Sequence, residues 1–465
     1  MTDFASLLQA DRGGPARAIH LVDKKSFADW AKKQGAARRA LLDAARFEGK
    51  TAFQFAIFPA AQGEEWEVVT TVANVAQLSP WCLARLAESL PEGSYRLSGG
   101  DPGPAMLGWL MGQHRLVRYK SKNEDQRGPR VLLTKEAADI DRMVRLAEAT
   151  ASVRDLVDTP AADLGPAELE SAARALAKEY GAKVEVTSGD ALAQGFPMIA
   201  AVGQGAARNR SPRLIEIAWG KESAPRVAIV GKGVCFDSGG LDIKSASGMR
   251  LMKKDMGGAA HALALAKLVM AERLPVRLHV LVPAVENSVS ADALRPGDVI
   301  DSRKGLKVEI DNTDAEGRLI LGDALAKAGE AHPELIIDFA TLTGAARVAL
   351  GPDLPAMFAN DDGLAADLEE AARNVDDPIW RMPLWDGYDE MLKSDLADLS
   401  NASESPMAGS VTAALFLRHF VPEGTAWAHF DTFAWRPSAK PGRAKGGEAM
   451  GLRSAFAMLV KRYAA

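Results

Sequence analysis

The chain has 465 residues, of which 47% are hydrophobic and 25% are charged, and its formal net charge is -5. This composition is typical of a folded globular protein, and the length predicts two or three domains. The small net charge gives no sign of a nucleic-acid or membrane partner, and two isolated cysteines, Cys82 and Cys235, argue against a disulfide framework or a thiolate zinc site.

The first part of the chain, residues 1–134, is predicted to form a small α/β domain. Its beginning lacks the features of a secretory signal, and no stretch offers the roughly 18 apolar residues of a membrane span, so we expect a cytoplasmic protein. Short apolar runs at Thr51–Ala60 and Glu67–Val75 are interleaved with a helical pattern at Trp81–Leu90. The segment SKNEDQRGPR at 121–130 has the composition of an exposed connector.

Apolar residues then recur at helical spacing, so residues 135–160 are expected to form a linker helix. Residues 161–465 are predicted to form a larger C-terminal α/β domain, with a mixed central sheet flanked by helices, because strand-like and helix-like runs alternate there. The strand-like runs are Val227–Val230, Leu278–Val282, Lys307–Ile310, Leu335–Phe339 and Ala426–Phe430. The helix-like runs are Gly258–Ala271, Leu319–Ala331 and Leu364–Val375.

Three segments dense in charge and glycine carry the candidate chemistry, namely GKGVCFDSGGLDIKS (231–245), MKKDMGG (252–258) and DNTDAEGRL (311–319). In open α/β sheets, ligand sites lie on the loops at the carboxyl ends of strands. We therefore expect loops to carry Lys232, Asp237, Asp242, Lys244, Asp255, Asp311, Asp314, Glu316 and Arg318.

Carboxylates that converge repel one another and need a compensating cation. Divalent metals are the natural compensation, and a pair of ions about 3.5–4 Å apart is common in hydrolases. Any one of these charged residues alone is more often a solvated surface residue, so the prediction depends on their density.

These segments resemble the leucine aminopeptidase (cytosol aminopeptidase) family. The signature NTDAEGRL stands intact at Asn312–Leu319, and the element Gly-Lys-Gly-x-x-Phe-Asp-Ser-Gly-Gly matches Gly231–Gly240. The element Lys-x-Asp-Met-Gly-Gly matches Lys253–Gly258, and Ala-Thr-Leu-Thr-Gly-Ala matches Ala340–Ala345. The resemblance extends from about Val153 to the C-terminus, whereas the N-terminal domain resembles the family only by position.

The resemblance implies a metal-dependent aminopeptidase that releases N-terminal amino acids from peptides, with residues 161–465 as its catalytic domain. Two divalent metal ions, Mn or Zn and possibly Mg, would activate a bridging water. Asp237 and Glu316 would bridge the metals, Asp255 and Lys232 would complete one site, and Asp314 would complete the other. Lys232 would ligate only as a neutral amine, which burial and nearby divalent charge favour by lowering its pKa.

The family pattern also implies residues that contact the substrate. Lys244 would contact the scissile carbonyl and the developing oxyanion, and Arg318 would hold a bicarbonate ion that acts as general base. The planar guanidinium suits bidentate binding of such an oxyanion. Met252, Thr341 and Gly344 match positions that line the pocket for the first side chain, although core residues would look no different.

The chain departs from the family pattern near its end. Relatives commonly have the sequence His-Leu-Asp-Ile-Ala-Gly at the positions of His429–Ala434. In this chain Phe433 replaces a small residue that would lie near that pocket. A bulky ring there would narrow or reshape the pocket, so a preference for leucine is not implied. Asp158 is interpreted as a helix-end or turn residue, Cys235 as a small core residue and His261 as a residue packed against a helix neighbour.

Two alternatives stay open at this point. Metals and carboxylates do not by themselves define the substrate, so a two-metal hydrolase of another bond, such as a phosphoester, is one alternative. A non-catalytic scaffold on the same fold is the other, although every matched functional position is kept. The family forms hexamers, so the resemblance implies a homo-oligomer acting on peptides with a free N-terminus.

Overall fold

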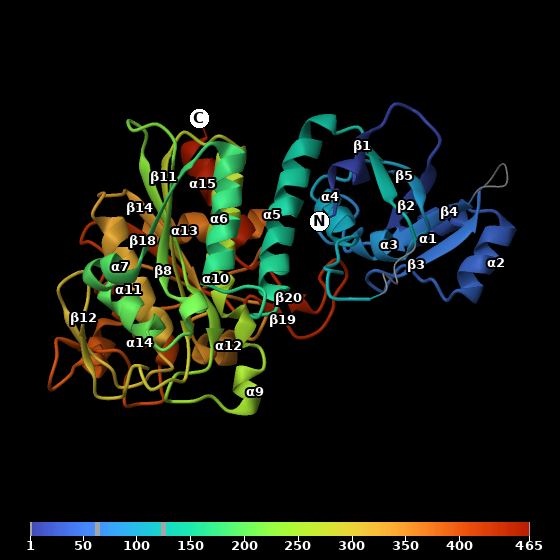
Figure 1. Ribbon diagram of the computed structural model, residues 1–465. Helices are drawn as coiled ribbons and strands as arrows, with labels where there is room; N and C mark the ends of the chain where they lie inside the picture. The colour runs from blue at the N-terminus through green and yellow to red at the C-terminus, as the bar shows by residue number, and fades with distance from the viewer. Residues whose placement is uncertain (1, 61–65, 122–126, 465) are drawn as a thin grey trace. The chain divides into compact units, whose positions relative to one another are not determined.

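The structure, a computed structural model, describes residues 2–60, 66–121 and 127–464 (Figure 1). The chain folds into two compact units. The N-terminal unit comprises Met1–Ala151 and Ser438–Lys445, and the C-terminal unit comprises Ser152–Pro437 and Gly446–Ala465. Residues 122–126 of the predicted connector lie outside the described residues. Within the described parts of the chain, every helix is too short or too polar to cross a bilayer.

The N-terminal unit is built on a six-stranded sheet in the order β1-β6-β5-β2-β4-β3, parallel except for the antiparallel pair β3 and β4. These strands are β1 Leu8–Ala10, β2 Arg17–Val22, β3 Phe55–Pro59, β4 Trp66–Thr71, β5 Gly93–Leu97 and β6 Arg130–Thr134. Its helices are α1 Phe27–Lys32, α2 Ala36–Ala44, α3 Ala84–Ser89 and α4 Ala105–Met111. β3, β4 and α3 confirm the strand and helix patterns that the sequence predicts there.

The core of this unit forms around α4, which is buried along its whole length. The ring of Trp109 packs 5.5 Å from that of Tyr95, and its indole Nε1 donates a hydrogen bond to the Arg130 carbonyl at 2.9 Å. The buried indole is thereby satisfied, as large polar-tipped aromatic residues require.

One long helix, α5 Ile140–Asp158, begins in the N-terminal unit and ends in the C-terminal unit. It lies within the range 135–160 predicted for a linker helix. The predicted domain bounds, 1–134 and 161–465, stay a prediction. Asp158 is the last residue of α5, in agreement with its interpretation as a helix-end residue, and it accepts a hydrogen bond from the Gly447 amide at 2.8 Å.

The C-terminal unit contains a mixed nine-stranded sheet in the order β16-β15-β18-β14-β9-β11-β8-β7, with β10 paired to β11. Its strands are β7 Lys183–Ser188, β8 Arg213–Trp219, β9 Arg226–Gly231, β10 Gly233–Asp237, β11 Arg277–Asn287, β14 Leu335–Ala340, β15 Ala356–Ala359, β16 Trp380–Arg381 and β18 Ala426–Asp431. The central strands β18, β14, β9 and β11 are parallel. Every residue of β14 is buried, which is typical of a central parallel strand covered on both faces.

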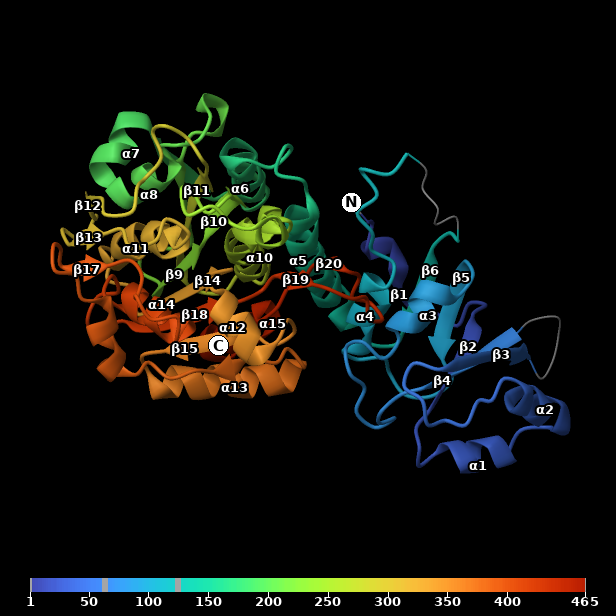
Figure 2. The ribbon, with the colours of Figure 1, turned by 90° about the horizontal axis from the view of Figure 1, so that it is seen from below.

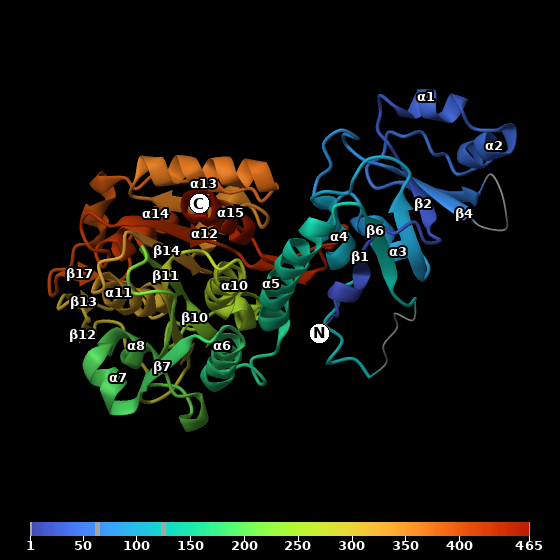
Figure 3. The same ribbon diagram turned by 90° about the horizontal axis from the view of Figure 1, so that it is seen from above.

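Helices cover both faces of this sheet (Figures 2 and 3). One face carries α6 Pro166–Tyr180, α10 Gly257–Ala271, α13 Asp362–Val375 and α15 Leu452–Tyr463, and the other carries α8 Pro197–Gly203, α11 Glu316–Gly329 and α14 Gly409–Arg418. Shorter helices are α7 Gly189–Gly195, α9 Ala246–Met249 and α12 Gly344–Leu350. The layered arrangement confirms the predicted fold class, a mixed sheet flanked by helices.

Two predictions about elements need correction. The run Lys307–Ile310 does not join the main sheet, because β13 Lys307–Glu309 pairs with β12 Val299–Asp301 and β17 Leu399–Ser400 in a separate three-stranded sheet. The helix predicted to start at Leu319 begins three residues earlier, at Glu316. The first turn of this helix contains charged residues, so the spacing of apolar residues does not reveal where the helix starts.

The parallel strands bring the predicted site residues to one edge of the sheet. Lys232 follows β9, Asp237 ends β10, Thr341 follows β14 and Asp431 ends β18. Asn287 ends β11, beside Asp237 in the strand register. Because these are carboxyl ends of strands, this edge is where an α/β sheet places its ligand site.

The start of α10 lies unusually close to two of these strands. A Cβ atom on Gly258 would lie 2.1 Å from the Phe339 carbonyl oxygen and 2.8 Å from the Lys232 amide nitrogen. Both are backbone atoms, held by the hydrogen bond from Lys232 N to Phe339 O at 3.0 Å. The close approach therefore requires glycine.

We predict that Gly258→Ala lowers the free energy of unfolding by about 1–3 kcal/mol, because neither strand has room to retreat. Urea denaturation measures the change. Gly195→Ala is the matched control, since a Cβ there would meet only the Arg303 Nη1 atom, at 3.5 Å. Equal stability of the two variants would contradict the close packing of α10.

Candidate active site

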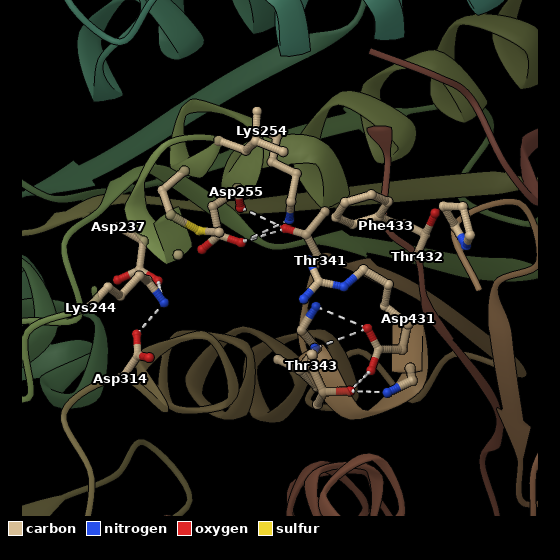
Figure 4. Close-up of a pocket in the computed structure, with 18 of the residues that line it drawn as sticks. Asp237, Lys244, Lys254, Asp255, Asp314, Thr341, Thr343, Asp431, Thr432 and Phe433 are labelled. Carbon is tan, nitrogen blue, oxygen red and sulfur yellow. Dashed lines mark hydrogen bonds and ion pairs between the residues drawn. The ribbon is translucent and has the colours of Figure 1, made fainter. Parts of the chain in front are cut away.

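A cavity of about 510 Å³ opens at this edge of the sheet (Figure 4). All five residues predicted to bind metal line it, namely Lys232, Asp237, Asp255, Asp314 and Glu316. It is also lined by Lys244, by Met252, Thr341 and Gly344, and by Phe433. The structure thus brings together residues from segments that are far apart in the sequence. We call this cavity the polar cavity.

Three buried carboxylates form the centre of the polar cavity. Asp237, Asp255 and Glu316 are each 2% exposed, and one oxygen of each lies within 4.8 Å of the others. Lys232 lies among them, with its Nζ atom 2.7 Å from Asp255 Oδ2 and 2.9 Å from Glu316 Oε1. The buried negative charges are therefore paired, as burial of charge demands.

Regular structure, rather than loops, holds most of this cluster. Asp237 is the last residue of β10, Asp255 lies in the 3-10 turn Met252–Met256 before α10, and Glu316 is the first residue of α11. The expectation that these carboxylates lie on loops is wrong. Strand and helix ends fix the carboxylates more firmly than loops would, which a preorganised binding site needs.

Lys244 and Asn287 tie this centre to its surroundings. The Lys244 Nζ atom lies 2.6 Å from Asp237 Oδ2 and also pairs with Asp314. The Asn287 amide donates hydrogen bonds to Asp237 Oδ1 at 3.0 Å and to Glu316 Oε2 at 3.5 Å. Asn287 is a site residue that the sequence reasoning missed, because the predicted strand run ends at Val282 whereas β11 continues to Asn287.

The charges in the cluster shift one another's protonation. Burial raises the pKa of Glu316 to about 8, and Asp237 adds to this shift while Lys232 opposes it. For Lys232, burial acts to lower the pKa, but Asp255, Glu316 and Asp237 together raise it. The expected downward shift of the Lys232 pKa thus depends on cations, because the carboxylates alone produce the opposite shift.

The donor set fits divalent cations. Carboxylate oxygens are the ligands that hard cations prefer, and a divalent ion among three carboxylates would supply the positive charge that the lysines now provide. A nearby divalent charge would also disfavour an ammonium at Lys232. The chemistry of the residues present therefore agrees with a cation site at Asp237, Asp255 and Glu316.

Three of the predicted charged residues have other positions. Asp242 accepts a hydrogen bond from the Thr313 amide at 2.7 Å and so joins two segments of the site. Asp311 is exposed. Arg318 is not among the described residues that line the polar cavity, and its Nη1 atom donates to the Asn401 carbonyl at 2.8 Å. Its Nε atom is buried without a hydrogen-bond partner among the described residues.

Met252, Thr341, Gly344 and Phe433, the residues expected near the pocket for the first side chain, also line the polar cavity. Thr341 Oγ1 donates to Asp255 Oδ1 at 2.7 Å and thereby orients that carboxylate. Lys254, a second residue that the sequence reasoning missed, also lines the cavity although it is only 5% exposed. Its signal in MKKDMGG was a second lysine directly before Asp255.

The residues interpreted as structural are buried in contacts of their own. Cys235 is buried, and burial raises the pKa of its thiol, which disfavours a nucleophilic thiolate. The His261 ring stands in α10, where Nδ1 lies 2.7 Å from the Gly257 carbonyl and Nε2 accepts from the Met450 amide at 3.0 Å. Both ring nitrogens are therefore occupied.

Comparison with known proteins gives a consistent result. The family model for the cytosol aminopeptidase family, catalytic domain, matches residues 151–456, and that for the M17 aminopeptidase, N-terminal domain, matches residues 18–129. A probable cytosol aminopeptidase of Syntrophotalea carbinolica is 44% identical over 322 residues, which cover 68% of this chain and 64% of that relative.

Two solved structures are also similar over nearly their whole length. The crystal structure of a cytosol aminopeptidase from Coxiella burnetii has 43% identity and a TM-score of 0.92, and the match covers 98% of this chain and 99% of that one. The bottromycin maturation enzyme BotP in complex with Mn has 30% identity and a TM-score of 0.86, with 96% of this chain and 100% of that chain covered.

The geometry of the carboxylate cluster predicts that Glu316→Gln weakens binding of Mn²⁺ at least tenfold, because a neutral amide replaces a charge at the centre of the cluster. Titration calorimetry measures the affinity. Glu330→Gln is the matched control, since Glu330 directly follows α11 and pairs with Arg303 at 2.6 Å. Equal Mn²⁺ affinity in both variants would show that Glu316 is not a ligand.

Proposed function

Because this chain belongs to the cytosol aminopeptidase family, we propose that the polar cavity is the active site of a metal-dependent aminopeptidase. The enzyme releases single residues from the N-termini of peptides. The observation that carries this proposal is the buried cluster of Asp237, Asp255 and Glu316 at the carboxyl ends of the central strands. The full match to a solved cytosol aminopeptidase supports it.

Two divalent cations would be held by Lys232, Asp237, Asp255, Asp314 and Glu316, with Asp237 and Glu316 shared between them. When bound, such a pair of cations makes a water reactive near neutral pH and polarises a carbonyl. We propose Mn or Zn, with Mg as a third possibility, and the Mn complex of the related bottromycin maturation enzyme supports Mn. Asn287 keeps two of the carboxylates in place through its amide hydrogen bonds.

Lys244 acts on the substrate carbonyl. Its ammonium lies in the cavity wall beside Asp237 and Asp314, so it is positioned to donate a hydrogen bond to an oxygen that gains negative charge. Preorganised donors of this kind contribute roughly 3–4 kcal/mol to the stabilisation of a transition state. Both carboxylates keep the Lys244 ammonium protonated, since they raise its pKa against the effect of burial.

Arg318 would hold a bicarbonate ion, which supplies a proton acceptor when bound. Two observations support this role, namely its place in the first turn of α11, two residues after Glu316, and its buried Nε atom without a hydrogen-bond partner among the described residues. The guanidinium of arginine stays charged at neutral pH, although burial lowers the Arg318 pKa to about 10.

The cavity also has the parts that selection for an N-terminal residue requires. A free amine can bind a cation as a neutral ligand, and the side chain next to it would enter the space beside Met252, Thr341, Gly344 and Phe433. We further propose that the protein works in the cytoplasm, as the names of its relatives suggest, and as a homo-oligomer, with a hexamer the expected form. Sedimentation of the purified protein measures the oligomeric state.

The proposed function predicts that the enzyme hydrolyses leucine or alanine 4-nitroanilide in the presence of Mn²⁺ or Zn²⁺. Chelation with EDTA abolishes the rate, and added metal restores it, because the cations supply the reactive water. Glu316→Gln should be inactive under conditions in which Glu330→Gln turns over normally. Hydrolysis of phosphoesters alone, or full anilide turnover after removal of metal, would contradict the proposal.

The bulky ring of Phe433 is expected to narrow the pocket for the first side chain. We expect Phe433→Ala to raise kcat/KM for leucine anilide relative to alanine anilide by about tenfold, because each buried methylene of the substrate contributes that order of discrimination. Phe433→Leu keeps most of the volume and serves as the control. If the leucine-to-alanine ratio stays the same in Phe433→Ala, Phe433 does not limit the pocket.

A further inference from the structure

We propose that Lys254 recognises a carboxylate on the substrate, so that the enzyme prefers peptides whose N-terminal residue is glutamate or aspartate. The inference rests on the proposed function of the polar cavity and deepens it by naming a substrate class. It follows from the surroundings of one buried ammonium group.

Lys254 is a buried cation that faces the cavity, and its ion pair with Asp255 is long. The residue is 5% exposed, yet it lines the polar cavity. Among the residues that the structure describes, no oxygen accepts a hydrogen bond from its Nζ atom, and the nearest carboxylate oxygen, Asp255 Oδ1, is 4.0 Å away. A buried ammonium without an acceptor is costly, so a group that enters the cavity with a negative charge would be bound strongly.

The carboxylates near Lys254 are already engaged. Asp255 pairs with Lys232 at 2.7 Å and accepts a hydrogen bond from Thr341 at 2.7 Å. Asp431 accepts hydrogen bonds from the backbone amides of Leu342 and Thr343, both at 3.1 Å. Neither carboxylate is therefore free to compensate Lys254 fully.

Phe433 holds two cations on this side of the cavity. The Lys254 Nζ atom lies 5.1 Å from the centre of the Phe433 ring, and the Arg347 Cζ atom lies 5.0 Å from it. Figure 4 shows Lys254 and Phe433 beside each other, away from Asp237, Lys244 and Asp314. Attraction between each cation and the aromatic ring positions both head groups. The side of the cavity remote from Asp314 therefore carries two cations and an aromatic ring beside one carboxylate, Asp431, unlike an apolar leucine pocket.

The position of Lys254 favours the side chain of the first residue over other substrate carboxylates. Lys254 directly precedes Asp255, one of the proposed metal ligands, and we place the substrate amine at the cation that Asp255 would hold. The side chain of the N-terminal residue starts from the carbon that bears the amine, whereas the second residue lies beyond the scissile bond. In the substrate, a side-chain carboxylate of an N-terminal glutamate or aspartate is therefore fewer bonds from the amine than the C-terminal carboxylate of a dipeptide. It would accordingly lie nearer to Lys254.

A site with a buried polar group that needs a partner rejects substrates that lack that partner far more strongly than an apolar pocket rejects an extra methylene. The sharpest comparison is between glutamate and glutamine, which have nearly the same size and differ in charge. We expect wild-type kcat/KM for glutamyl 4-nitroanilide to exceed that for glutaminyl 4-nitroanilide by at least tenfold.

The test measures this glutamyl-to-glutaminyl ratio in the metal-loaded enzyme and in Lys254→Met, which keeps the unbranched shape and removes the charge. We expect the ratio to fall at least tenfold in Lys254→Met. Lys253→Met is the matched control, because Lys253 is the neighbouring lysine, donates to the Asp158 carbonyl and is not among the described residues that line the cavity. The ratio should stay at its wild-type value in that control.

The outcomes separate this inference from the proposed function. A ratio near one in the wild type, with leucine anilide still hydrolysed, would overturn the role of Lys254 and leave the aminopeptidase intact. No hydrolysis of any aminoacyl anilide would remove the proposed function and this inference together. If Lys254→Met fails to fold, inhibition of the wild type by free glutamate and by free glutamine decides, and equal inhibition would overturn the inference.

A further arm identifies the source of the carboxylate. The dipeptide Leu-Gly and Leu-Gly amide differ only in the C-terminal carboxylate, and the hydrolysis rate of each is measured. Unchanged rates for both substrates in Lys254→Met support recognition of the first side chain, because leucine has no carboxylate for Lys254 to bind. Selective loss of the Leu-Gly rate would assign Lys254 to the C-terminal carboxylate instead and would overturn the proposed substrate class.

Discussion

The structure depends on the mutual repulsion of three buried carboxylates and on the positive charge that offsets it. Asp237, Asp255 and Glu316 have oxygens within 4.8 Å of one another and are almost fully buried, so unpaired charge among them is strongly disfavoured. Lys232 and Lys244 offset this charge in the described residues through contacts of 2.6 to 2.9 Å. The same concentration of negative charge would let the cluster bind cations.

The fold sets this cluster in place through its parallel strands. β9, β10, β14 and β18 end at one edge, and the adjoining starts of α10 and α11 bring Asp255 and Glu316 to the same point. Gly258 permits the approach of α10 to the backbone of β14, because any side chain there would meet the Phe339 carbonyl. The chemistry and the packing are therefore coupled at a few residues, and the site is as rigid as the sheet edge itself.

Much of this was predictable from the sequence, and the failures have physical causes. The strand runs and the order of charged segments predicted the α/β fold and the convergence of the carboxylates, and the family signatures named the five proposed ligands. Glu316 was expected on a loop because charged residues begin α11 and conceal its helical spacing. Asn287 and Lys254 were missed because their roles depend on burial and on neighbours distant in sequence, which apolar periodicity does not report. The cavity thus shows a cationic, aromatic side that a family signature alone would not predict.

The central claim is that the cluster binds two divalent cations that the reaction requires. Diffraction from crystals soaked in Mn²⁺, recorded at the Mn absorption edge, tests it most directly. We expect two anomalous peaks in the polar cavity, both in contact with Asp237 and Glu316, in crystals of a protein active in solution. Absence of any peak at Asp237, Asp255 and Glu316 in such crystals would contradict it.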